Sequence, residues 1–183
     1  KRQEAQVHVA SFQQRGAPVT CDDRAVMRSF EVRAEVDAPL EATWSVLTAW
    51  ERQSEWAMLT TTRGIGPTGG HAVGEEVHAF TGVGRVGFLD TMVVEVWEPP
   101  WRCRVRKTGR VVRGAAEFTV QAVPGGRSSV TYRAEVLVPG GKIGAAAWPA
   151  VRAGFAAGFR RSLQSLARIV EREQPDAGPP RAR

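Results

Sequence analysis

The sequence predicts an α+β domain in which an antiparallel sheet packs against one long helix, and three observations support this prediction. Between residues 28 and 138, apolar and polar residues alternate with a period of two in several segments, which is the pattern of half-buried strands. Glycine and proline clusters separate these segments, as turns do in a meander. One amphipathic stretch, residues 143–170, follows the last strand and can bury its apolar stripe only by lying across the dry face of the sheet.

The domain is predicted to begin with a strand and two short helices. The first strand carries alternating apolar residues, which are Phe30, Val32, Ala34 and Val36. Pro39 then suits the first turn of a helix, and residues 40–50 carry apolar side chains at helical spacing. We expect a second short helical turn over residues 51–56.

A meander is predicted to follow. Residues 64–70 are rich in glycine and predict a loop. The predicted strands are one that contains Val77 and Ala79, and then residues 86–97, 101–107, 114–120 and 130–136. The string Gly82-Val83-Gly84-Arg85-Val86-Gly87 matches a dinucleotide-binding fingerprint, but a β-rich run follows it where that fingerprint needs a helix. We therefore interpret it as a hairpin turn and expect no cofactor.

The long helix is unusual in its first half, which consists mostly of glycine and alanine, Gly154 and Gly158 included. Interior glycines destabilise a helix by roughly 1 kcal/mol each relative to alanine, so they indicate that something lies close to that face. Two interpretations remain: the small residues leave a cavity under the helix, or they permit tight packing on the sheet. A bend is expected near Pro149.

Length and composition support one globular domain. With 183 residues, 43% of them hydrophobic and 24% charged, the chain can bury a real core and is not disordered as a whole. We assign residues 1–27 to an N-terminal extension, residues 28–172 to the domain and residues 173–183 to a basic tail. The two cysteines, Cys21 and Cys103, exclude a disulfide framework and favour a reducing, cytoplasmic location. No apolar run is long enough to span a membrane and no signal peptide is visible, so we expect no stable membrane insertion.

The net charge of +6 does not by itself predict a nucleic-acid partner. The basic residues are spread along the chain with acidic residues among them. Arg102, Arg104 and Arg106 do alternate on the wet face of one predicted strand. This stripe is either a solvated face with ion pairs across strands or a docking surface for an acidic partner, and we predict no nucleic-acid binding because glutamates interrupt it.

Residues 28–172 resemble the START-like (SRPBCC) superfamily. The resemblance rests on Val36-Asp37-Ala38-Pro39 followed by Trp44, Leu47 and residues 50–56, then on Val73-Gly74-Glu75, and then on the segments 94–102, 114–118 and 163–170. It implies the helix-grip fold of polyketide cyclase-like, Bet v 1-like and lipid-transfer proteins, in which a curved sheet wraps around the long helix. It also implies an apolar cavity for a hydrophobic small molecule, lipid- or polyketide-like. The cavity residues we expect are Val77, Val94, Cys103, Val105, Phe118, Tyr132, Trp148, Phe155 and Phe159.

Polar side chains on the dry face are the candidates for chemistry, because a buried polar group needs a partner. Tyr132 alternates with apolar residues and either points a hydroxyl into the cavity or reaches the rim. Lys107 also falls on this face, but we expect it to extend out to solvent from the strand end. The sequence leaves open which face His78, Asp90 and Thr91 occupy. The three histidines and two cysteines lack zinc-ligand spacing, so we expect no metal.

Two functions follow from these candidates. The first is a binding protein that holds the hydrophobic molecule without catalysis. The second is a polyketide cyclase/aromatase-type enzyme, in which Tyr132 and His78 would act as acid or base. The sequence makes no prediction of the oligomeric state.

Overall fold

The structure is a computed structural model and describes residues 26–109, 113–138 and 141–174. The elements in chain order are β1 (Val26–Val36), α1 (Leu40–Thr48), the 3-10 helix η1 (Trp50–Glu55), β2 (Thr60–Ile65), β3 (Glu76–Val83), β4 (Val86–Glu98), β5 (Arg102–Lys107), β6 (Gly114–Val123), β7 (Arg127–Val138) and α2 (Gly141–Glu173). The predicted N-terminal extension and basic tail lie almost entirely outside the described residues.

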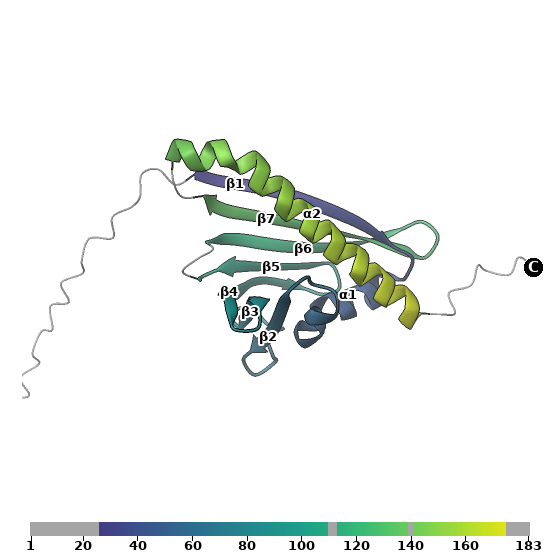
Figure 1. The fold of residues 1–183 in the computed structure, drawn as a ribbon. Helices are drawn as coiled ribbons and strands as arrows, with labels where there is room; N and C mark the ends of the chain where they lie inside the picture. The colour runs from purple at the N-terminus through teal and green to yellow at the C-terminus, as the bar shows by residue number, and fades with distance from the viewer. Residues whose placement is uncertain (1–25, 110–112, 139–140, 175–183) are drawn as a thin grey trace, which may run out of the picture.

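Seven strands form one antiparallel sheet in the order β1-β7-β6-β5-β4-β3-β2. The sheet curves, and α2 crosses its concave side from the edge strand β1 toward α1 (Figure 1). The predicted helix-grip α+β fold is therefore confirmed, with α1 and η1 as the two short helices after the first strand.

Strand β2 is the element that the sequence analysis missed, because Gly64 and the glycines that follow the strand suggested a loop. Gly64 lies within β2 and pairs with Val77. A Cβ on Gly64 would lie 1.7 Å from the carbonyl oxygen of Gly69, so only glycine lets the two backbones approach this closely. The indole of Trp50 donates a hydrogen bond to the neighbouring Gly70 carbonyl at 3.1 Å, which holds the β2–β3 loop against η1.

The register of the strands decides which side chains face the helices. We call this concave side the inner face. Across it, Val32 pairs with Tyr132, Tyr132 pairs with Phe118, and Phe118 pairs with Cys103. On the next row, Ala134, Ala116, Val105 and Val94 are all buried. The alternation predicted for β5, β6 and β7 is thus the alternation that builds the core.

Helix α2 is fixed to the body by its second half. Leu163, Leu166 and Val170 are 0% exposed. In the first half, Val151 and Phe155 lie on the same predicted stripe but are 44% and 49% exposed. The helix continues through Pro149 without interruption. Among the side chains that the structure describes, the apolar stripe is therefore buried in the second half of α2 and half-exposed at Val151 and Phe155.

Candidate ligand-binding face

An aromatic cluster joins α2 to the inner face. The ring of Phe159 stacks on Tyr132 with centroids 4.1 Å apart and an interplanar angle of 13°. Phe118 lies 4.8 Å from Tyr132 on the neighbouring strand, and Phe155 stacks on Phe30 at 6.0 Å. This cluster, at the middle of α2, thus contains four of the predicted cavity residues: Phe118, Tyr132, Phe155 and Phe159.

The Tyr132 hydroxyl is held in its neutral form. Burial, and then the negative charge of Asp90, raise the pKa of Tyr132 well above its ordinary value of 10.0. The residue itself is only 4% exposed. At physiological pH this hydroxyl is neutral and can donate a hydrogen bond.

A buried ion pair lies on the same face, at the middle of β4 and the end of β5. Lys107 Nζ donates a hydrogen bond to Asp90 Oδ2 and approaches the Met92 sulfur at 3.7 Å. The second carboxylate oxygen, Asp90 Oδ1, is buried and has no hydrogen-bond partner among the residues that the structure describes. Beside it lies Gly109, on which a Cβ would come within 3.2 Å of that oxygen. A charged pair with an unsatisfied acceptor therefore faces the interior.

The ion pair corrects one expectation. We expected Lys107 to extend into solvent, but its side chain is 11% exposed and bonds to Asp90. The physical reason is the register of the strands, which pairs Lys107 with Met92 on the inner face. Asp90 precedes Met92 by two residues on β4, so its carboxylate faces the same side and lies within reach of Lys107. The sequence could place Lys107 on the dry face but could not supply its partner.

The structure also settles the facing of the other polar candidates. Asp90 lies on the inner face in register with Ala79. His78 and Thr91 pair with each other on the opposite, outer face, where His78 Nε2 lies 2.7 Å from Glu76 and Thr91 bonds to Thr108. His78 and Tyr132, the two predicted acid–base candidates, are therefore not brought together.

The remaining predicted cavity residues belong to the packed core. Val77, Val94, Cys103 and Val105 are at most 4% exposed on the inner face. Burial, and then the charge of Glu117, raise the pKa of the Cys103 thiol to about 12, so this cysteine is unreactive. Trp148, in the first half of α2, is 8% exposed.

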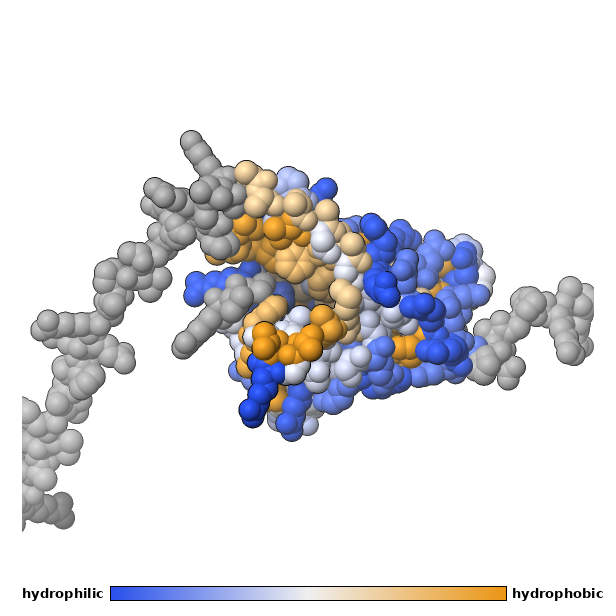
Figure 2. Space-filling model, in the orientation of Figure 1, coloured by the Kyte–Doolittle hydropathy of each residue, from blue (hydrophilic) through white to orange (hydrophobic). Residues whose placement is uncertain are grey.

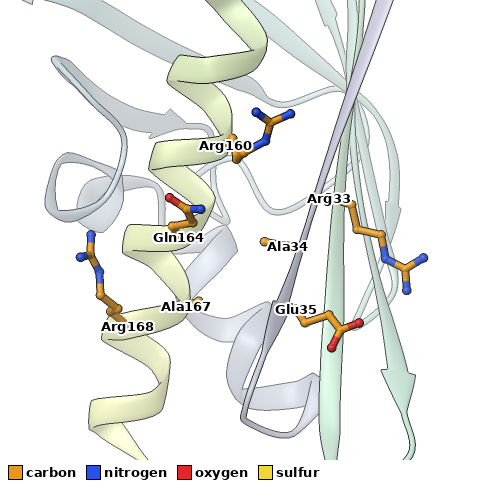
Figure 3. Close-up of a pocket in the computed structure, with 7 residues that line it drawn as sticks. All are labelled: Arg33, Ala34, Glu35, Arg160, Gln164, Ala167 and Arg168. Carbon is orange, nitrogen blue, oxygen red and sulfur yellow. The ribbon is translucent and has the colours of Figure 1, made fainter.

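Two surface grooves run along the edge of the sheet, between β1 and α2. The larger, of about 510 Å³, is lined by Arg33, Ala34, Glu35, Arg160, Gln164, Ala167 and Arg168. Figure 3 shows Arg33 and Glu35 extending from β1 to the side away from α2. The second groove, of about 340 Å³, includes Phe30, Arg152 and Ala156. None of the predicted cavity residues lines either groove, but Phe30 of the second groove stacks on Phe155, so this groove adjoins the aromatic cluster.

The arginine stripe on the outer face is paired with glutamates. Arg102 bonds to Glu117 at 2.9 Å, Arg104 to Glu135 at 3.2 Å and Arg106 to Glu95 at 2.7 Å. These partners come from β6, β7 and β4. The arrangement favours the interpretation of a solvated face with ion pairs across strands.

Neither a metal centre nor a membrane span is found in the described part of the chain. Within residues 26–109, 113–138 and 141–174, no group of three or more histidine, cysteine, aspartate or glutamate side chains could hold a metal ion. None of the described helices is both long and apolar enough to cross a membrane.

Comparisons with known proteins agree with this fold. A family model described as polyketide cyclase/dehydrase and lipid transport matches residues 27–171, whereas no curated protein sequence matches. The aromatase/cyclase Zhui from Streptomyces sp. R1128 is 17% identical, with a TM-score of 0.66 over 84% of this chain and 99% of its own. A protein from Nitrosomonas europaea is 14% identical, with a TM-score of 0.62 over 80% and 96% of the two chains. A point mutant of norcoclaurine synthase from Thalictrum flavumn is 13% identical, with a TM-score of 0.59 over 82% and 98%.

Proposed function

This chain belongs to the polyketide cyclase/dehydrase and lipid transport family, and from that membership we propose that it binds a hydrophobic small molecule, lipid- or polyketide-like. The site lies between the inner face of the sheet and the first half of α2. Pockets for small molecules are mostly apolar and carry a few polar groups that fix orientation. The inner face has this composition, with the aromatic cluster as its apolar part and Tyr132, Asp90 and Lys107 as its polar groups.

The observation that carries the proposal is the unequal burial of α2. Leu163 and Leu166 are 0% exposed, whereas Phe155 is 49% exposed and Val151 is 44% exposed on the same stripe. Phe155 packs on Phe30 of the sheet but stays half-exposed, and such an accessible apolar side chain indicates a surface that a ligand covers. A hydrophobic ligand would complete the burial that the second half of the helix achieves with the protein alone.

A fluorescence titration with N-phenyl-1-naphthylamine, a neutral hydrophobic probe, tests this proposal. We expect saturable enhancement with about one site per chain, since such a pocket is expected once per domain. Phe155→Ala should weaken binding several-fold. Trp101→Ala is the matched control, because Trp101 is 58% exposed in the β4–β5 turn at the opposite end of the sheet. Enhancement that does not saturate, or that both variants reduce equally, would contradict the proposal.

A second candidate function is catalysis of the polyketide cyclase type, and the polar groups on the inner face favour it. Tyr132 keeps its proton because burial and Asp90 raise its pKa. Its neutral hydroxyl could therefore donate a hydrogen bond to a ligand carbonyl oxygen and stabilise the negative charge that develops there as a carbon–carbon bond closes a ring. The test is product analysis with an unreduced poly-β-ketone. Tyr132→Phe should change the products while leaving probe binding intact, and products that are identical with and without the protein would exclude this function.

A further inference from the structure

The exposed hydrophobic side chains of this protein gather at one end of the sheet. Among the described residues, eleven large hydrophobic side chains are exposed, and eight of them surround this end. We call these eight residues the mouth rim; they are Met27, Met58, Leu59, Val83, Val86, Leu89, Val151 and Phe155. The most exposed are Val86 at 81% and Val83 at 68%, at the tip of the β3–β4 hairpin.

The topology brings these residues together although they are far apart in the sequence. Neighbouring strands of this sheet run in opposite directions. One end of the sheet therefore holds the starts of β1, β6, β4 and β2 and the ends of β7, β5 and β3. The amide of Gly82 donates to the Leu59 carbonyl at 2.9 Å, which joins the start of β2 to the hairpin tip. Figure 2 shows hydrophobic surface over the first half of α2 and over the β3–β4 hairpin, on two sides of a hollow.

Most mouth-rim residues lie in segments of the sequence that carry no acidic residue. Residues 56–63, 77–89 and 136–170 contain no aspartate or glutamate. Arg85 lies between Val83 and Val86, and Arg152 follows Val151. The outer face is different, since its arginines are matched by Glu95, Glu117 and Glu135.

We propose that the mouth rim docks reversibly on an anionic lipid surface. Apolar side chains in segments that carry arginine but no acidic residue, such as the β3–β4 hairpin tip and the first half of α2, fit the boundary between headgroups and acyl chains of an anionic bilayer. Docked in this way, the opening between α2 and the sheet faces the bilayer. A second copy of the chain fits this surface less well, because a two-fold contact through the rim would place Arg85 and Arg152 against like charges.

Vesicle co-sedimentation tests this docking. We expect the protein to sediment with vesicles of phosphatidylcholine and phosphatidylglycerol but not with phosphatidylcholine alone, and salt should weaken the binding. Val86→Asp should reduce it at least about fivefold, because it puts an acid among the inserted groups. Val73→Asp is the matched control, since Val73 is 65% exposed in the β2–β3 loop at the opposite end. Equal binding to both kinds of vesicle, or equal loss in both variants, would overturn the proposal.

Two further measurements separate this inference from the proposed function. Val86→Asp should bind N-phenyl-1-naphthylamine like the wild type, because the hairpin tip lies outside the aromatic cluster. A protein that binds the probe but no vesicles would overturn the docking and leave the proposed function standing. Sedimentation as a dimer that Val86→Asp converts to a monomer, without vesicle binding, would identify the rim as a contact between copies and would likewise overturn it.

Discussion

Lys107 and Asp90 form an ion pair on the inner face in which neither partner is solvated. Their side chains are 11% and 7% exposed, respectively. An ion removed from water is stabilised only by its counter-ion and its hydrogen bonds. Each member of this pair therefore depends on the other, and this dependence can be measured.

Loss of one partner should cost much more stability than loss of both. We expect Lys107→Met to lower the free energy of unfolding by about 3–5 kcal/mol, because it leaves the Asp90 carboxylate buried and uncompensated. The double variant with Asp90→Leu should recover most of that loss. Urea denaturation of the wild type, both single variants and the double variant measures the coupling. Additive effects of the two substitutions would show that the ions do not interact.

Stability should fall as the pH rises above about 9. The folded protein raises the pKa of Tyr132 and raises the pKa of Cys103 to about 12. In the unfolded chain these groups ionise near pH 10 and pH 8.5, respectively, so alkaline pH stabilises the unfolded state relative to the folded one. The contribution of each group is fully present below its unfolded pKa and is lost as the pH rises toward the folded one. Tyr132→Phe should retain more of its neutral-pH stability at about pH 11 than the wild type, as urea midpoints will show.

The two halves of α2 should respond differently to truncation. Leu163→Ala removes a side chain that is 0% exposed and should cost about 2–5 kcal/mol. Phe155→Ala removes a larger side chain that is 49% exposed and should cost less than about 2 kcal/mol. Chemical denaturation of the two variants checks this order. The reverse order would mean that the first half of α2 carries the packing.

The arginine stripe should not bind nucleic acid. Arg102, Arg104 and Arg106 each have a glutamate within 3.2 Å, so phosphate would compete with an existing partner. We expect no shift of generic RNA or duplex DNA in a mobility assay at about 0.15 M salt. Micromolar binding that disappears in the Arg104→Glu, Arg106→Glu variant would contradict this expectation.

Most of the fold could be predicted because its signals are local. The period-two alternation around Val105, Phe118 and Tyr132 identified the inner face of three strands. The helical stripe that contains Leu163 and Leu166 identified α2. Strand β2 could not be predicted, since Gly64 is required by the approach of Gly69, and that approach exists only in the folded chain.

The site was less predictable because it depends on contacts between distant residues. The resemblance and the alternation predicted Phe118, Tyr132 and Phe159 for one site, and the ring of Tyr132 lies in contact with the other two rings. The partner of Lys107 is Asp90 on another strand, and hydrophobic periodicity carries no information about such a pair. His78 shows the same limit, because nothing local to the glycine-rich hairpin indicates which way its strand faces.

The one-sided attachment of α2 implies a gradient of amide protection along the helix. Every hydrogen bond between the body and an α2 side chain found among the described residues involves the second half of the helix: Met58 N with Ser162, Asp37 N with Glu171, and Arg52 with Glu173. Backbone hydrogen bonds in the second half of α2 should break only when the whole domain unfolds. Turns near Val151 should open in local fluctuations that require less free energy. Hydrogen–deuterium exchange would then divide one continuous helix into a slow and a fast half. Such local opening would let a large ligand enter while Leu163, Leu166 and the sheet stay in place.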